Sequence, residues 1–121
     1  MQPKAQNMET ADRRFDKRVA VDLLCTLVLP SGVKHSVMAR NLSGGGAYVE
    51  VETPLSRGEQ VELSFNLPTQ GRLRRVHTRS EIIHGPSRIS MTAFGIGVRF
   101  VELDEEGAEL VDAFIDTQPA L

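Results

Sequence analysis

The chain has 121 residues, the length of one ordinary domain, and its hydrophobic share of 40% is enough for one core. Its net charge of -2 provides no overall attraction to nucleic acid. The single cysteine, Cys25, excludes an internal disulfide, and no apolar run approaches the roughly 20 residues that a membrane helix needs, so we expect a soluble cytoplasmic protein.

In chain order, the sequence begins with a polar segment, residues 1–12, for which we expect a disordered N-terminal tail. After it, hydrophobic residues recur at every second position, which is typical of half-buried strands. Six such segments follow at a spacing of about ten residues, separated by turns that contain Pro or Gly. The six expected strands cover residues 19–29, 33–40, 47–52, 61–66, 72–84 and 94–100.

The last part of the chain is expected to contain a loop, one more strand and a helix. Residues 85–90 are expected to form a loop, because they contain Gly, Pro and Ser. In the last strand, Gly95 and Gly97 share one face, where something bulky is expected to pack close. Asp104 then predicts a helix N-terminus, and the apolar stripe that follows ends near Thr117. Six strands and one terminal helix predict a small antiparallel barrel or sandwich. Closure would remove the exposed edges.

Four cations lie within six residues ahead of the first strand: Arg13, Arg14, Lys17 and Arg18. Such density carries like-charge repulsion, which a doubly anionic ligand would relieve. Arginine also presents several donors in a rigid fork, which suits phosphate oxygens or the O6 and N7 acceptors of guanine. The alternative is a solvated basic arm without a ligand.

A polar, glycine-rich turn follows the second expected strand, from Asn41 to Gly46. Asn41 and Ser43 are able to donate and accept hydrogen bonds along a base edge. The three glycines permit a positive φ and allow the backbone to approach a ligand closely. The alternative is a flexible turn in which Asn and Ser bond their own backbone.

Together the two segments resemble the signature of PilZ domains, which are bacterial receptors for cyclic di-GMP. That signature reads Arg-x-x-x-Arg, then a gap like the one found here, then Asp or Asn-x-Ser-x-x-Gly, and this chain matches every position. The strand at residues 97–100 and the acidic start of the closing helix also look like the family's ending. We therefore expect a PilZ domain over residues 13–117, followed by a C-terminal tail at residues 118–121.

The resemblance implies an all-β fold, a six-stranded antiparallel PilZ-type barrel with one C-terminal α-helix. It implies cyclic di-GMP as the ligand, no other cofactor, and a protein partner that reads a ligand-induced change of shape. In the family, the arginines contact phosphates and guanines, the Asn and Ser bond guanine, and the final Gly shapes the turn. The implied ligand-binding residues here are Arg13, Arg14, Arg18, Asn41, Ser43, Gly45 and Gly46.

Two other binding roles stay open, a PilZ-like interaction module that binds no nucleotide, as in pilus assembly, and a small-barrel nucleic-acid binder. The second would use the arginines of residues 72–79. That stretch lacks the aromatic residues that stack on bases, so a solvated face is the expected interpretation, with no nucleic-acid and no membrane partner. His84 or Ile83, late in the fifth strand, is expected beside a bound guanine.

An enzymatic role is not expected. Ser43 lacks the glycine two residues before it that a Gly-x-Ser-x-Gly nucleophile elbow requires. The three histidines share no ligand spacing with Cys25, so no metal site is expected, and Cys25 is interpreted as a core residue of the first strand.

Overall fold

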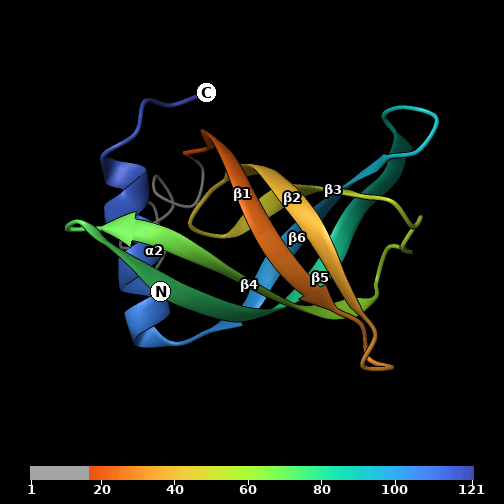
Figure 1. The fold of residues 1–121 in the computed structure, drawn as a ribbon, viewed down its shortest axis with the longest axis horizontal. Helices are drawn as coiled ribbons and strands as arrows, with labels where there is room; N and C mark the ends of the chain where they lie inside the picture. Colours follow the sequence, from red (N-terminus) through yellow and green to blue (C-terminus); the bar gives the residue numbers. More distant parts are fainter. Residues whose placement is uncertain (1–16) are drawn as a thin grey trace, which may run out of the picture.

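The computed structural model describes residues 17–121, which form a closed barrel of six antiparallel strands and one helix (Figure 1). Around the barrel the strands follow the order β1-β2-β3-β6-β5-β4. The prediction of a six-stranded antiparallel barrel with a C-terminal helix is confirmed. The elements are β1 (Val19–Val28), β2 (Lys34–Leu42), β3 (Gly46–Val51), β4 (Gln60–Thr69), β5 (Arg72–Arg88), β6 (Phe94–Leu103) and α2 (Glu105–Asp116).

One hydrophobic core fills the barrel, because the alternating apolar residues of all six strands point inward. Cys25 belongs to this core, as expected, and is 2% exposed. The largest fully buried side chains are Leu27, Leu42, Leu63, Leu67, Ile82, Ile96 and Ile115.

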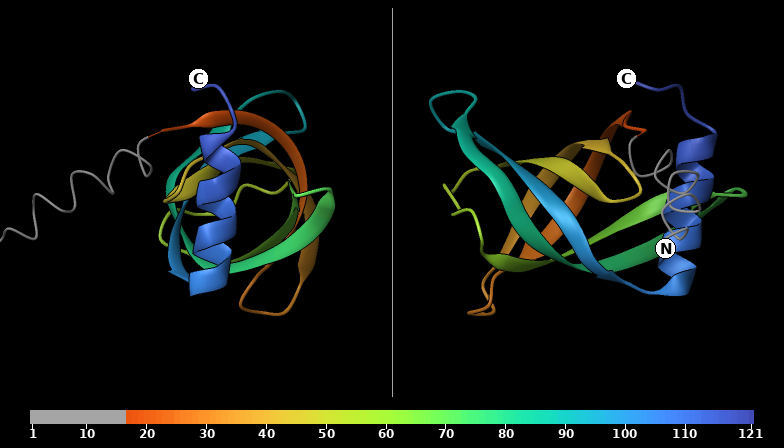
Figure 2. Two further views of the ribbon diagram at one scale, coloured as in Figure 1. Left: turned by 90° about the vertical axis from the view of Figure 1, so that its left-hand side faces the viewer. Right: turned by 180° about the vertical axis from the view of Figure 1, so that it is seen from behind.

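Helix α2 lies across one end of the barrel, where it contacts β4 and β5 (Figure 2). Val111 and Ile115 are its buried aliphatic side chains. Asp104 is the N-cap, as predicted, and its Oδ1 accepts a 2.6 Å hydrogen bond from the Gly107 N–H. Across residues 17–121, no helix combines the length and the apolar character needed to cross a bilayer.

The expected loop at residues 85–90 is wrong over its first four residues, because β5 continues to Arg88. Ser87 pairs with Gly95 and Arg88 with Phe94, so hydrogen bonding to β6 outweighs the local turn preference of Gly and Pro. Gly85 adopts a φ of 87°, which only glycine reaches without strain.

The segment after α2 contacts the backbone just before β1. The Leu121 N–H donates a 2.8 Å hydrogen bond to the carbonyl oxygen of Arg18, the residue that precedes β1. The segment after the helix is therefore in contact with the backbone of a predicted ligand-binding residue.

Candidate functional site

Arg18 and Asn41 are brought together by the pairing of β1 with β2. Val19 pairs with Leu42 and Ala20 with Asn41, so Arg18 lies beside the end of β2. The Arg18 Nη1 donates a 2.6 Å hydrogen bond to Asn41 Oδ1. The 23 positions between these two residues are therefore spanned by a single antiparallel hairpin.

A bulge in β2 directs Asn41 to the outside of the barrel. Ala39 pairs with Val49 of β3, whereas Asn41 pairs with the adjacent Tyr48, which leaves Arg40 as the extra residue. Ala39 is buried in the core, and a regular two-residue period would have pointed Asn41 inward as well. The bulge thus places the amide on the same outer face as Tyr48.

Arg40, the bulged residue, is held by carboxylates on both neighbouring strands. Its Nη1 lies 2.6 Å from Asp22 Oδ1 on β1, and its Nε lies 3.1 Å from Glu50 Oε2 on β3. The hydrogen bonds to Glu50 and then to Asp22 raise the pKa of the Arg40 guanidinium above its usual value. Exposed pairs of this kind add little to stability, and here they link the bulged residue to both neighbouring strands.

The Ser43 hydroxyl lies inside the turn that joins β2 to β3. Its Oγ accepts hydrogen bonds from the Gly45 N–H at 3.2 Å and the Gly46 N–H at 3.1 Å. The Ser43 N–H donates to the Gly46 carbonyl at 2.8 Å. Ser43 is 1% exposed, so the structure shows the arrangement in which this serine bonds its own backbone. A direct bond from Ser43 to a ligand stays a prediction.

Gly46 matters because it allows a close backbone approach. Its φ is not in the left-handed region, so this residue does not use the positive φ that glycine permits. A methyl group on Gly46 would lie under 3.0 Å from the Val98 carbonyl oxygen, because the turn packs directly against the β6 backbone. The Gly45 carbonyl also accepts a 2.8 Å hydrogen bond from the Phe100 N–H. The glycine turn is thus fastened to β6.

A cavity of about 310 Å³ lies on the outer face of the barrel next to this turn. Residues of four strands that are adjacent in the barrel, β2, β3, β6 and β5, border it together with Arg18, which precedes β1. Arg18 is the only permanently charged group among the described lining residues, and none of them is a carboxylate. The site therefore suits an anionic, hydrogen-bonding ligand. The lining residues are Arg18, Asn41, Ala47, Tyr48, His84 and Gly97.

A second bulge brings His84 into this cavity. Ile82 pairs with Val98 of β6, whereas His84 pairs with the adjacent Gly97, so Ile83 is the extra residue. His84 consequently lies on the outer face, although it is two positions after the buried Ile82. Of the two residues expected near a ligand, His84 borders the cavity that contains Arg18 and Asn41.

The prediction that bulky side chains pack against Gly95 and Gly97 is confirmed. A methyl group on Gly95 would lie under 3.0 Å from the Tyr48 hydroxyl oxygen, and one on Gly97 would lie 3.2 Å from the His84 ring. The sequence reasoning did not identify Tyr48 as a site residue. The two glycines indicated that a bulky side chain lies over β6. They did not show that this side chain comes from β3, which is the neighbour of β6.

The remaining site predictions are not tested by this geometry. Arg13 and Arg14 lie outside the described residues, so their relation to the cavity stays a prediction. Gly44 and Gly45 line a separate groove of about 420 Å³ with residues 99–101, Leu103 and Ala108. Among residues 17–121, no group of three His, Cys, Asp or Glu side chains is placed to hold a metal ion.

Three arginines of the basic stretch on β5 are engaged by neighbouring polar and acidic groups. Arg74 forms an ion pair with Glu106, and Arg79 forms one with Glu102 at 3.2 Å. Arg75 donates to Ser64 Oγ at 3.3 Å. Acidic groups thus pair with two of the four arginines of residues 72–79. The expectation that no nucleic acid binds this stretch stays a prediction.

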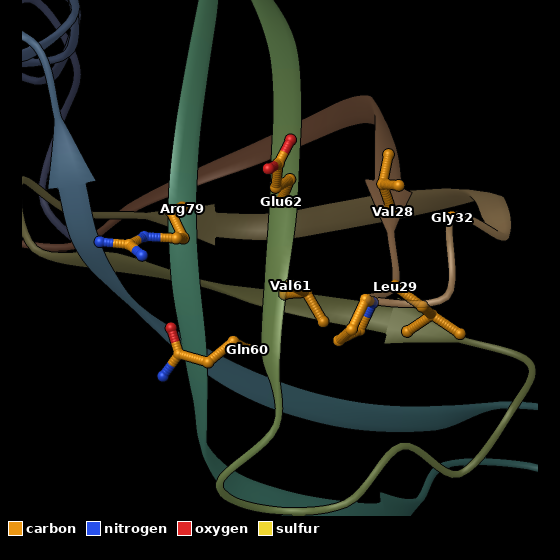
Figure 3. Close-up of a pocket in the computed structure, with 8 residues that line it drawn as sticks. Val28, Leu29, Gly32, Gln60, Val61, Glu62 and Arg79 are labelled. Atoms are coloured by element: carbon orange, nitrogen blue, oxygen red, sulfur yellow. The ribbon is translucent and has the colours of Figure 1, made fainter.

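A cavity of about 350 Å³ lies at the other end of β1, beside the segment where β1 pairs with β4 (Figure 3). These strands pair only over Thr26–Val28 and Glu62–Ser64. Aliphatic side chains wall the cavity, and Glu62 and Arg79 lie at its edge. Both charged groups already have partners, His77 and Glu102, and none of the predicted site residues is present.

The fold defines a small closed-barrel domain with one helix across its end. The family model of the PilZ domain matches residues 12–117, and the chain belongs to this family. No curated protein sequence matches the chain.

Solved structures share this fold at low sequence identity. The Bacillus subtilis inhibitor of motility, MotI (DgrA), is 16% identical with a TM-score of 0.73, and the match covers 84% of this chain and 48% of MotI. The chain thus spans about half the length of MotI. The PilZ domain of Escherichia coli YcgR with c-di-GMP is 17% identical, with a TM-score of 0.64 and coverage of 84% and 87%. Borreliella burgdorferi PlzA in complex with c-di-GMP is 20% identical, with a TM-score of 0.52 and coverage of 92% and 45%.

Proposed function

We propose that this chain is a receptor for cyclic di-GMP that binds the nucleotide at the Arg18–Asn41 cavity. The observation that carries the proposal is the 2.6 Å hydrogen bond between Arg18 and Asn41, which joins the two halves of the family motif at one cavity. Membership of the PilZ family supports it. The structures of YcgR and PlzA with c-di-GMP support it as well.

The chemistry of the site suits a cyclic dinucleotide, which combines two phosphate anions with two guanine bases. The Arg18 guanidinium uses one donor on Asn41 and has further N–H groups for a phosphate or for the O6 and N7 atoms of guanine. Asn41 accepts through Oδ1 and retains its amide N–H donors for a base. Arg13 and Arg14 add cationic donors from the segment before the barrel.

The glycine turn contributes shape more than direct contact in this proposal. Ser43 fixes the Gly45 and Gly46 amides from inside, and Gly46 lets the turn lie on β6. A micromolar affinity corresponds to about 8 kcal/mol. A few charge-assisted hydrogen bonds at about 1.5–3 kcal/mol each, together with base stacking, supply that amount after ordering costs.

Binding transmits a signal by repositioning the segment that carries Arg13 and Arg14. Cations this close in sequence repel one another, and a dianionic ligand offsets the repulsion when the segment folds over the cavity. The changed surface near the start of β1 is then read by an effector protein. The chain itself carries out no reaction in this proposal.

Titration calorimetry of the full chain with cyclic di-GMP tests the proposal, with GTP and cyclic GMP as control ligands. We expect saturable binding of cyclic di-GMP alone. A chain that folds but does not bind cyclic di-GMP would instead be a PilZ-like interaction module. Binding of DNA or RNA that weakens steeply with salt would indicate a nucleic-acid binder.

A further inference from the structure

Tyr48 lies along the surface of the barrel instead of standing away from it. Its backbone pairs with Gly97 on β6, yet its hydroxyl reaches over Gly95, two residues further along that strand. Side chains on a strand ordinarily stand roughly perpendicular to the sheet. Tyr48 is therefore tilted down onto β6, and it is half-buried there at the edge of the Arg18–Asn41 cavity.

Glycine at position 95 makes this posture possible. Any side chain there would occupy the space of the Tyr48 hydroxyl, since a methyl group would lie under 3.0 Å from both the Oη and Cζ atoms. Gly97 has a similar relation to the His84 ring, at 3.2 Å. Two rings thus lie over two glycines of one strand, and both border the cavity.

Other aromatic rings are engaged elsewhere in the described part of the chain. Phe65 and Phe100 stack on each other with centroids 6.4 Å apart, and the Arg88 guanidinium covers Phe94 at 4.8 Å. Of the two rings that border the same cavity as the Arg18 guanidinium, the phenol ring of Tyr48 is larger than the imidazole of His84. A flat ring beside a cationic fork fits a ligand that carries both a planar base and a phosphate.

We propose that Tyr48, which lies over Gly95, supplies the ring on which a guanine base of the bound nucleotide stacks. The inference rests on the proposed function and assigns a base-binding role at that same site. Arg18 and Asn41 then select the phosphate and the base edge, while Tyr48 binds the base face. Stacking on an aromatic ring tolerates any base, so Tyr48 contributes affinity and Asn41 contributes selectivity.

The intrinsic fluorescence of the protein tests this contact without a mutation. The chain contains one tyrosine and no tryptophan, so the emission comes from Tyr48 alone. We expect cyclic di-GMP to quench it saturably, with the midpoint found by calorimetry. Free tyrosine titrated in parallel corrects for absorption by the nucleotide. Unchanged corrected emission at saturating cyclic di-GMP would overturn the proposal.

Substitutions separate the ring from its hydroxyl and from its support. Tyr48→Leu should weaken cyclic di-GMP binding about 5- to 150-fold, which is the equivalent of the about 1–3 kcal/mol that stacking of a base on an aromatic side chain is worth. Tyr48→Phe should bind like the wild type. Gly95→Ala should weaken binding by displacing the ring, and should add little in a Tyr48→Leu background. Leu73→Ala, at an exposed position near the start of β5, is the control.

The outcomes separate this inference from the receptor function. If Arg18→Ala loses binding while Tyr48→Leu, folded by circular dichroism, binds like the wild type, the stacking role is wrong and the receptor function stands. If the wild-type chain does not bind cyclic di-GMP, both proposals are wrong. Coincident weakening in Tyr48→Leu and Gly95→Ala, with Tyr48→Phe unaffected, supports the stacking role.

Discussion

Replacing Ser43 with alanine tests whether this side chain holds the turn or serves only to contact the ligand. In the structure its Oγ accepts the N–H groups of Gly45 and Gly46, and the residue is 1% exposed. Ser43→Ala therefore removes the acceptor of two backbone donors. We expect the variant to lose stability before any ligand is added.

The size of the effect follows from those two donors. A backbone N–H left without a partner costs about 1–3 kcal/mol when it is buried, and Gly46 is buried whereas Gly45 is half-buried. Because water reaches Gly45, we expect a loss of about 2 kcal/mol in the free energy of unfolding. For a chain of this length that corresponds to a fall in Tm on the order of 5–10 °C.

Urea denaturation of the ligand-free protein measures this loss, with Ser36→Ala as the matched control on the exposed face of β2. The control should unfold at the wild-type midpoint, with the same m value for all three proteins. Ser43→Ala should also weaken cyclic di-GMP binding, through the turn. If Ser43→Ala were as stable as the wild type but bound cyclic di-GMP more weakly, the serine would act on the ligand directly, and our reasoning would be refuted.

Two further predictions concern the same turn and the core. Gly46→Ala should destabilise the fold by about 1–3 kcal/mol, because its methyl group meets the backbone of Val98; a wild-type thermal midpoint would contradict this. Burial raises the pKa of the Cys25 thiol from 9.0 to about 11. Below pH 9 the thiol is protonated in both the folded and the unfolded protein, and the contribution of this pKa difference to folding stability is fully present. Between pH 9 and 11 the thiol ionises in the unfolded protein first, so that contribution is lost as the pH rises through 11. Urea titrations should show the steeper alkaline loss in the wild type than in Cys25→Ala, and equal slopes would contradict the assignment.

The alternation of apolar residues was sufficient to predict the six strands. Leu27, Leu63 and Ile96 lie on the inward faces of their strands and are buried, as the alternation predicted. A two-residue period can be recognised from the local sequence alone. The helix start was equally local, since Asp104 caps its own first turn. The continuation of β5 through Gly85 was not predictable in this way, because it depends on pairing with a strand that comes later in the sequence.

The candidate site was only partly visible for a related reason. Arg18 and Asn41 were identified from their motif, but the outward direction of Asn41 depends on the bulge at Arg40. The same holds for His84, which the bulge at Ile83 moves to the outer face. A bulge reverses the alternation from which strand faces are inferred. Tyr48 was missed because its position over Gly95 requires that β3 and β6 be neighbours.

The central claim is that Arg18, placed by Asn41, binds cyclic di-GMP. Calorimetric titration of Arg18→Ala against Arg57→Ala tests it most directly, because the two variants lose the same charge and Arg57 lies in the loop between β3 and β4. The account predicts that Arg57→Ala binds like the wild type, whereas Arg18→Ala, with unchanged thermal stability, binds at least about tenfold more weakly. Equal affinities of the two variants for cyclic di-GMP would contradict it.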